Sequence, residues 1–326
     1  QKKIDMWSLK DIAEDIQKDF DPGSPEKLTD LITGFNLDEK TKPVFSDRIK
    51  VEPLDTWKLE HPLGKELIME KISFPSLVEH ENGNDTTRFY LYRNGDLKGR
   101  DVILWVPGMA VSDFAFWFIK RFFAEELKRD YDIVFYVPPY HMERTEDGKK
   151  NSQGFFTADT AQNVQNILNS VRELRTISGY LKKEGVRSIG GWGGSIGASM
   201  LLLMSQMVEL DHLCIMIPIL SWDTVILDNR HMKKIITMVT EHGIGEKEIL
   251  EAYDLINPVN YELKIHPDRI HIMYAEYDQL TPLEMITEFA AANNISNIIG
   301  YKRSHATILL SKKLYKDCGI FLDSVQ

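Results

Sequence analysis

The chain has 326 residues, of which 43% are hydrophobic and 27% charged, and its net charge at pH 7 is −10. This composition is typical of a globular protein and excludes a disordered, collagen-like or coiled-coil chain. The excess of acidic residues repels a phosphate backbone, so nucleic acid is not an expected partner. The length allows one large domain or two smaller ones.

The cysteines and apolar runs predict neither a disulfide-stapled fold nor a membrane span. The chain has 2 cysteines, Cys214 and Cys318, too few for a disulfide framework or a metal cluster, and we expect inert core thiols. No apolar run approaches the roughly 18 residues of a membrane span. The low cysteine count favours a reducing, cytoplasmic compartment. The chain does not begin with Met, so the removal of a signal segment stays open.

The first 64 residues show no strand-type alternation, and two helices are expected within them. Apolar residues recur every three or four positions from Met6 to Phe20, a spacing typical of an amphipathic helix. The Pro-Gly-Ser-Pro run 22–25 breaks this helix, and a second is expected over 27–35. These helices either form a layer on the main domain or cover an active site.

Segments of β character follow. Residues 66–74 and 87–93 are bounded by the turn-forming stretches 81–85 and 94–96, a pattern that predicts an antiparallel hairpin at one edge of a sheet.

From about residue 101, apolar strands alternate with helices. The expected strands are 102–106, 133–137, 186–191, 213–219, 269–275 and 297–301. Near-continuous apolar strands separated by helices indicate a parallel sheet covered on both faces. Residues 221–265 contain two helical stretches, 230–241 and 246–255, and no strand, so we expect a helical insertion above the strand ends.

A G-x-S-x-G pattern, Gly193-Gly194-Ser195-Ile196-Gly197, lies between the strand 186–191 and the next helix. In that setting the serine sits on a sharp, strained turn at the carboxyl end of the sheet. Side chains in place of the outer glycines would collide with the neighbouring strand and helix. Ser195 is therefore a candidate nucleophile. The alternatives are a glycine-rich turn without chemistry and a phosphate-binding loop, although no Lys follows as that loop requires.

A serine nucleophile needs a base and an acid that orients the base. Of 9 histidines, only His305 lies C-terminal to both Ser195 and the last acid at a strand end. Asp278, just past an apolar strand, is the favoured acid, and Glu276 and Asp223 are its rivals.

Acyl transfer also needs two backbone N–H groups to hold the oxyanion. One is expected from Ile196, which follows the nucleophile, and the other from Met109 in the loop 107–110. Gly108 lets that loop turn. A simple strand-end turn is the alternative.

Together, these residues resemble the α/β-hydrolase superfamily over residues 87–326. The resemblance rests on the order and spacing of Pro107-Gly108-Met109, the 193–197 pattern, Asp278 with Pro282, and His305. It implies an α/β fold with a mostly parallel, eight-stranded sheet and helices on both faces. It also implies a lid at 221–265, a Ser195–His305–Asp278 triad, and no metal or cofactor.

The chain departs from the family in two places. Many members have His-Gly in the oxyanion loop, where this chain has Pro107-Gly108, and a bulkier residue at the position of Gly194. Neither change removes a catalytic group, because the oxyanion donors are backbone atoms. Residues 1–86 are expected to form an N-terminal helical extension with an edge strand, outside the catalytic domain 87–326.

Four further residues are candidates for substrate binding: His141, Arg144, Phe155 and Trp222. All are expected near strand ends. Arg144 could hold a substrate carboxylate as a bidentate fork, or instead pair with Glu143 in its own loop. The aromatic residues would line an apolar acyl pocket, with ordinary core packing as the alternative.

The sequence thus predicts a serine hydrolase that cleaves a carboxylic ester or thioester with an apolar acyl part, through an acyl-enzyme on Ser195. One alternative is an acyltransferase or cyclising enzyme of a biosynthetic pathway that uses the same triad. Another is a non-catalytic ligand-binding protein on a hydrolase scaffold. The expected partner is a small molecule, and the sequence leaves the oligomeric state open.

Overall fold

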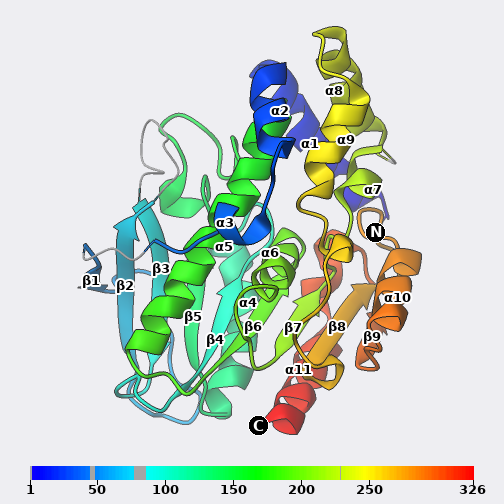
Figure 1. Cartoon of the computed structure of the whole chain (residues 1–326). Helices are drawn as coiled ribbons and strands as arrows, with labels where there is room; N and C mark the ends of the chain where they lie inside the picture. Colours follow the sequence, from blue (N-terminus) through cyan, green and yellow to red (C-terminus); the bar gives the residue numbers. More distant parts are fainter. Residues whose placement is uncertain (1, 45–47, 77–85, 228) are drawn as a thin grey trace.

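The computed structural model describes residues 2–44, 48–76, 86–227 and 229–326, and for residues 2–9, 113 and 114 it describes the backbone alone. A nine-stranded sheet runs through the molecule and carries helices on both faces (Figure 1). The strands are β1 (Lys50–Pro53), β2 (Ile68–Pro75), β3 (Thr86–Arg93), β4 (Asp101–Val106), β5 (Asp132–Val137), β6 (Ser188–Gly194), β7 (Leu213–Met216), β8 (Ile270–Ala275) and β9 (Ile298–Tyr301). The helices are α1 (Lys2–Lys18), α2 (Pro25–Ile32), α3 (Leu37–Lys40), α4 (Asp113–Lys128), α5 (Thr160–Lys183), α6 (Ile196–Met204), α7 (Trp222–Leu227), α8 (Arg230–Glu241), α9 (Glu246–Asp254), α10 (Leu283–Ala292) and α11 (Lys312–Val325).

The sheet is mostly parallel, as expected. Its strands lie in the order β1-β2-β3-β5-β4-β6-β7-β8-β9. All neighbours from β5 to β9 are parallel, whereas β1, β2 and β3 pair antiparallel at one edge. The pairing of β2 with β3 confirms the predicted hairpin. The turn-forming stretch 81–85 lies outside the described residues.

The sequence does not predict β1. This strand falls in a stretch where no strand is expected, and it makes the sheet nine-stranded rather than eight-stranded. All four of its residues are exposed, so it has no buried face and no apolar alternation that periodicity could detect.

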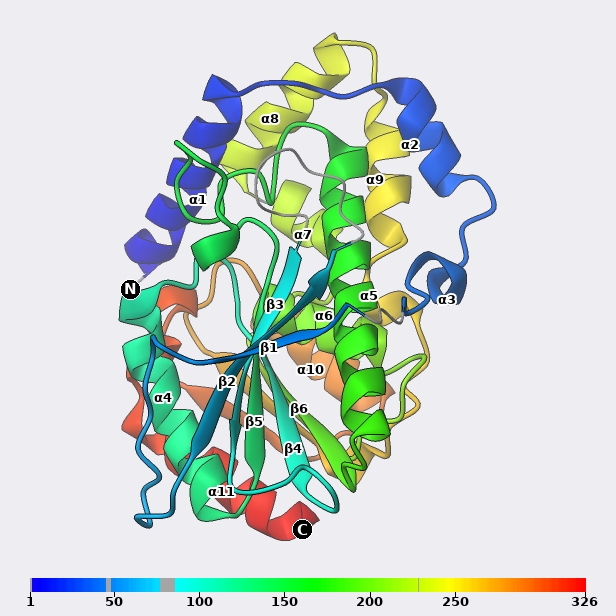
Figure 2. The ribbon, with the colours of Figure 1, turned by 90° about the vertical axis from the view of Figure 1, so that its left-hand side faces the viewer.

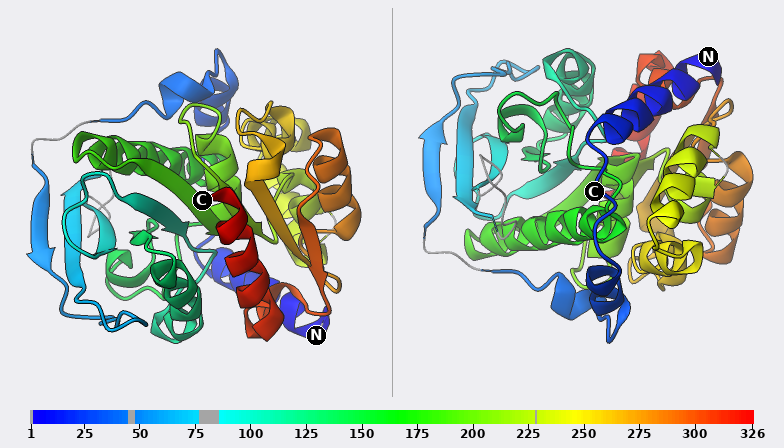
Figure 3. Two further views of the ribbon diagram at one scale, coloured as in Figure 1. Left: turned by 90° about the horizontal axis from the view of Figure 1, so that it is seen from below. Right: turned by 90° about the horizontal axis from the view of Figure 1, so that it is seen from above.

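Two hydrophobic cores lie on opposite faces of the sheet. Figure 3 shows α4 and α11 on one side and α5 on the other. One core joins the sheet to α5, α6 and α10, and the other joins it to α4 and α11. Cys214 on β7 and Cys318 on α11 are both buried in the second core as free thiols, and their sulfur atoms lie 3.8 Å apart.

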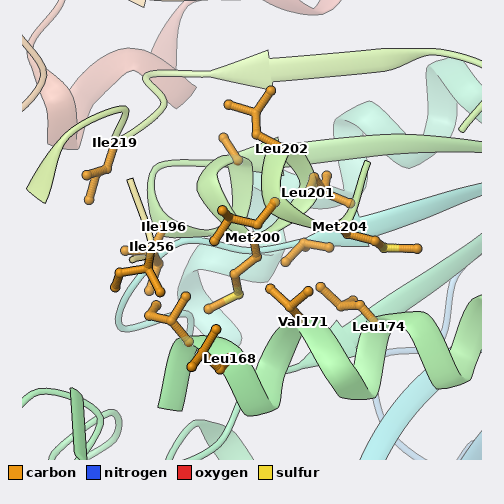
Figure 4. Packing of buried hydrophobic residues seen from close by; sticks show 14 of the residues in the cluster. Leu168, Val171, Leu174, Ile196, Met200, Leu201, Leu202, Met204, Ile219 and Ile256 are labelled. Atoms are coloured by element: carbon orange, nitrogen blue, oxygen red, sulfur yellow. The ribbon is translucent and has the colours of Figure 1, made fainter. Parts of the chain in front are cut away.

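Helix α6 is buried along its whole length, which makes it a rigid support for the turn that precedes it. Every residue of the helix is buried. Figure 4 shows Met200, Leu201 and Met204 of α6 beside Val171 and Leu174 of α5. Burying each such side chain stabilises the fold by about 1.5–3 kcal/mol.

The insertion between β7 and β8 is helical, as predicted. The two expected helical stretches form α8 and α9, and α7 is an additional short helix. The N-terminal helices pack against this insertion as well as against the main domain: α1 contacts α8, and α2 contacts both α9 and α5 (Figure 2). No helix in the described ranges is long and apolar enough to cross a membrane.

Candidate active site

Ser195 occupies a strained turn between β6 and α6. Its backbone has φ 54° and ψ −120°, a combination that non-glycine residues rarely adopt. The two outer glycines of the pattern are sterically required. A Cβ at Gly193 would lie 2.8 Å from the backbone of Ala198, and one at Gly197 would lie 2.1 Å from the carbonyl oxygen of Val106. The turn therefore packs tightly against the end of β4.

His305 connects Ser195 to Asp278. Its Nε2 lies 2.9 Å from the Ser195 hydroxyl oxygen, and its Nδ1 lies 2.9 Å from Asp278 Oδ2 and 3.1 Å from Oδ1. Asp278 also accepts hydrogen bonds from the backbone of Leu280 and from the backbone and hydroxyl of Thr281. Burial raises the pKa of Asp278, but His305 and these donors outweigh it and hold the pKa below its usual value.

The two rival acids lie elsewhere. Glu276 is exposed at the surface. Asp223 belongs to α7, where burial and the nearby Asp254 raise the pKa of its carboxyl group. Of the three candidates, Asp278 is the one that His305 contacts.

The loop after β4 lies directly beside Ser195. A Cβ at Gly108 would lie 3.3 Å from that of Ser195 and 3.2 Å from the carbonyl oxygen of Gly194, so only glycine fits there without displacement. The backbone N–H groups of Met109 and Ile196 donate to no acceptor within the described ranges. Both residues line the cavity above Ser195, and both N–H groups are therefore available to a ligand.

His141 does not line this cavity, contrary to the expectation that it binds substrate. It is fully buried, its Nδ1 lies 2.8 Å from the carbonyl oxygen of Pro139, and its Nε2 accepts a hydrogen bond of 3.0 Å from the backbone of Ala110. Because Pro139 accepts from Nδ1, Nε2 is the acceptor nitrogen of the neutral ring. Burial lowers the pKa of His141 to about 4. Its contact is thus with the loop that carries Met109.

Arg144 is also directed away from the cavity. It is fully buried and forms two hydrogen bonds with Glu173 on α5, at 2.8 and 3.0 Å. It also donates to the carbonyl oxygen of Val137. An unpaired guanidinium could not be buried there, so Glu173, rather than Glu143 or a substrate, neutralises it. Phe155 is likewise fully buried and absent from the cavity lining, whereas Trp222 does line it.

The cavity above Ser195 has a volume of about 320 Å³. Ser195 and His305 supply polar groups, and most of the remaining lining is aliphatic or aromatic. Segments far apart in the chain form its upper wall: Ile12 of α1, Trp222, Val225 and Ile226 of α7, Met232 of α8 and Tyr253 of α9. We call these six residues the roof.

Sequence reasoning did not identify Ile12 or Met232 as residues of the site. The apolar periodicity of α1 and α8 shows that each helix has a buried face, but it does not show what that face covers. Among the described residues, no group of three or more His, Cys, Asp or Glu side chains is arranged to hold a metal ion.

No protein-family pattern matches the sequence, and a comparison with curated proteins finds no match. Solved structures do match. An esterase of Pyrococcus furiosus is similar over 84% of this chain and 99% of its own, with a TM-score of 0.54 and 16% identity. The acetyl xylan esterase of Paenibacillus sp. R4 has a TM-score of 0.59 and 13% identity over 92% of each chain. An acylaminoacyl peptidase of Pyrococcus horikoshii has a TM-score of 0.55 and 14% identity over 80% of this chain and 41% of its own.

At such low identity these similarities define the fold. The chain has the α/β-hydrolase fold, as its sequence resemblance implied. The fold alone does not define an activity, because this fold carries many different functions.

Proposed function

We propose that this protein is a serine hydrolase that cleaves a carboxylic ester or thioester with an apolar acyl part. The observation that carries the proposal is the position of His305, within 2.9 Å of both the Ser195 hydroxyl and the Asp278 carboxylate. A buried acid that is hydrogen-bonded to a histidine, which is in turn hydrogen-bonded to a strained serine, forms a unit that activates the serine. The largely apolar cavity above Ser195 supports an apolar acyl group as the ligand.

In the proposed reaction, His305 removes the hydroxyl proton as Ser195 Oγ attacks the ester carbonyl carbon. The N–H groups of Met109 and Ile196 hold the negative charge of the tetrahedral intermediate. His305 then protonates the leaving alcohol or thiol, which leaves an acyl-enzyme. Water activated by His305 attacks the acyl carbon and releases the acid, while Asp278 holds the imidazole in the required tautomer.

We further propose that the chain is divided into a catalytic domain and an N-terminal extension. Residues 87–326 form the catalytic domain with a lid at 221–265, and residues 1–86 form an extension. The extension contributes to the site, since Ile12 is part of the roof.

The test uses a p-nitrophenyl ester series and a fluorophosphonate probe. Ser195→Ala should abolish stoichiometric labelling and lower kcat by about 10⁴-fold or more. Ser199→Ala is the matched control, because Ser199 lies on α6 and donates to Ile219 instead of contacting the cavity. Undiminished hydrolysis by Ser195→Ala would show that another group is the nucleophile. Absence of labelling in the unaltered protein would favour a ligand-binding role.

A second candidate, an acyltransferase or cyclising enzyme, uses the same three residues. The roof favours it, because a covered site limits the access of water to an acyl-enzyme. Products measured with water and with added alcohol or amine separate the two. A hydrolase should release mainly free acid at low acceptor concentration, whereas a transferase should already give mainly the ester or amide of the acceptor there.

A further inference from the structure

A second cavity adjoins the one above Ser195. It has a volume of about 430 Å³ and lies between α1 and the segment that follows β5. Ile12, Met109 and Phe156 line both cavities, so the two spaces meet at the residue whose N–H is the proposed oxyanion donor.

The two cavities differ in chemistry. The cavity above Ser195 is mostly aliphatic and aromatic, whereas charged or amide side chains make up about half of the second lining. A ligand that extends across both would therefore have an apolar part and a polar part.

The floor of the second cavity is built around Tyr140. Ser152 donates its backbone N–H to the carbonyl oxygen of Tyr140 at 2.7 Å, and Gln162 of α5 donates to the Tyr140 hydroxyl at 3.3 Å. Gly154, with φ 97°, passes so close that a Cβ there would lie 2.7 Å from the Tyr140 ring. Positive φ at Tyr140 and Ser152 indicates that tertiary contacts hold this segment in one conformation.

The charged groups of the lining are largely paired with one another. Lys150 Nζ lies 2.8 Å from both carboxylate oxygens of Asp15, and Lys149 is paired with Asp19. With Glu146, the lining holds three acidic and two basic side chains. The resulting net negative charge of the lining disfavours an anionic ligand.

Two polar groups of the lining are available to a ligand. In the part of the chain that the structure describes, the Ser152 hydroxyl and the Gln162 side-chain carbonyl take part in no hydrogen bond. A hydroxyl both donates and accepts, and an amide carbonyl accepts. These two groups are therefore complementary to the hydroxyls of an uncharged alcohol.

We propose that the second cavity binds the alcohol half of the substrate, and that this half is an uncharged polyol. The substrate would then be an ester of an apolar acid with a hydroxylated alcohol, with its carbonyl group at Met109 and its two halves in the two cavities. This inference rests on the proposed hydrolase function and specifies its substrate class.

The test compares two esters that differ only in the hydroxyls of the alcohol, glyceryl monooctanoate and propyl octanoate. We expect kcat/KM to be about tenfold higher for the glyceryl ester, because two neutral hydrogen bonds contribute about 0.5–1.5 kcal/mol each. Ser152→Ala and Gln162→Ala should each lower this ratio about threefold. Gln165→Ala, on the same helix but outside both cavities, should leave the ratio unchanged. Since both esters are measured on the same sample, the ratio does not depend on how much of a variant is folded.

Binding provides a readout that does not require turnover. Octyl glyceryl ether should bind to the Ser195→Ala protein about tenfold more tightly than octyl propyl ether, and Gln162→Ala should reduce that preference. Equal kcat/KM values for the two esters, together with equal affinities for the two ethers, would overturn the polyol assignment. Cleavage of octanoylcholine with a higher kcat/KM than that of glyceryl monooctanoate would also overturn it, because it would assign the cavity to a cationic alcohol. If no ester is cleaved but the ether preference holds, the hydrolase proposal fails and the polyol subsite stands.

Discussion

At the level of single residues, His141 is the side chain that holds the loop beside Ser195 in place. Ala110, which donates to His141, has a positive φ of 59°. Such a conformation persists only where neighbouring contacts compensate for its cost. The His141 ring also packs edge-on against Phe155, at 5.5 Å between centroids. We therefore expect His141 to position the N–H of Met109 without touching the substrate.

His141→Ala should lower kcat for ester hydrolysis by about 10²-fold, comparable to the loss of one oxyanion donor, with little change in KM. His141→Gln should recover part of kcat, because its side-chain carbonyl can accept from Ala110. Steady-state kinetics on p-nitrophenyl octanoate measures both effects.

The control is His212→Ala, because His212 is also buried but contacts neither cavity. If His212→Ala lowered kcat as much as His141→Ala does, general destabilisation would explain the loss. A fall in kcat/KM caused by KM alone would place His141 in substrate binding.

At the level of elements, α1 links the N-terminal extension to the insertion. It is held by an ion pair between Asp15 and Lys150 in the segment after β5, by a hydrogen bond from Lys234 of α8 to Gln17, and by contact with α8. Exposed ion pairs contribute only about 0–1 kcal/mol each. Among the α1 side chains that the structure describes, Ala13 and Ile16 are buried and apolar, and they contribute more to its attachment than the ion pair does.

Ile12→Trp should shorten the acyl chains that the protein accepts, because a larger side chain would occupy part of the roofed cavity. We expect kcat/KM for p-nitrophenyl octanoate to fall about tenfold or more, while that for the acetate changes little. A chain-length series measures the effect.

Lys10→Trp is the matched control, since Lys10 is exposed on the same helix. An unchanged chain-length profile in Ile12→Trp would mean that α1 does not bound the acyl site in solution.

At the level of the whole molecule, buried histidines make stability depend on pH. Burial lowers the pKa of His141, His212 and His271 to about 4 each. In the unfolded chain their pKa is about 6.5. Because the folded pKa is the lower one, the folded state is favoured fully above pH 6.5, and this stabilisation is lost as the pH falls from 6.5 towards 4. Burial raises the pKa of Glu126 well above its usual value, which acts in the opposite direction because it favours the folded state at low pH.

These histidines bind protons in the unfolded chain that they do not bind in the folded state, so the free energy of unfolding should fall with a measurable slope as the pH is lowered from 7.5 to 5. Urea denaturation between pH 7.5 and pH 5 measures this slope. His271→Phe should make this slope shallower, because it removes a group that contributes about one proton to the difference between the folded and unfolded states. The variant should stay folded, since the Phe can stack on Phe321 as the His271 ring does, at 5.1 Å between ring centroids.

His266→Gln should leave the slope unchanged, because His266 is exposed. A slope that His271→Phe does not alter would assign the acid sensitivity to other groups.

Short segments of the sequence are enough to predict those parts of this protein that depend on local pattern. Apolar runs and turn signals located the strands from β2 to β9. The outer glycines around Ser195 encode a tight turn, because a side chain at either position would clash with the neighbouring backbone. The order of Ser195, Asp278 and His305 identified three side chains that the structure brings within hydrogen-bond distance. Their catalytic roles stay predictions.

What each side chain contacts is set by the packing of elements that lie far apart in the chain. Arg144 and His141 lie near a strand end, as expected, yet one pairs with Glu173 of α5 and the other with Ala110. Ile12 reaches a cavity whose other walls come from the rest of the chain. A periodic pattern shows that a helix has a face to bury, but the partner of that face depends on how all the elements pack together.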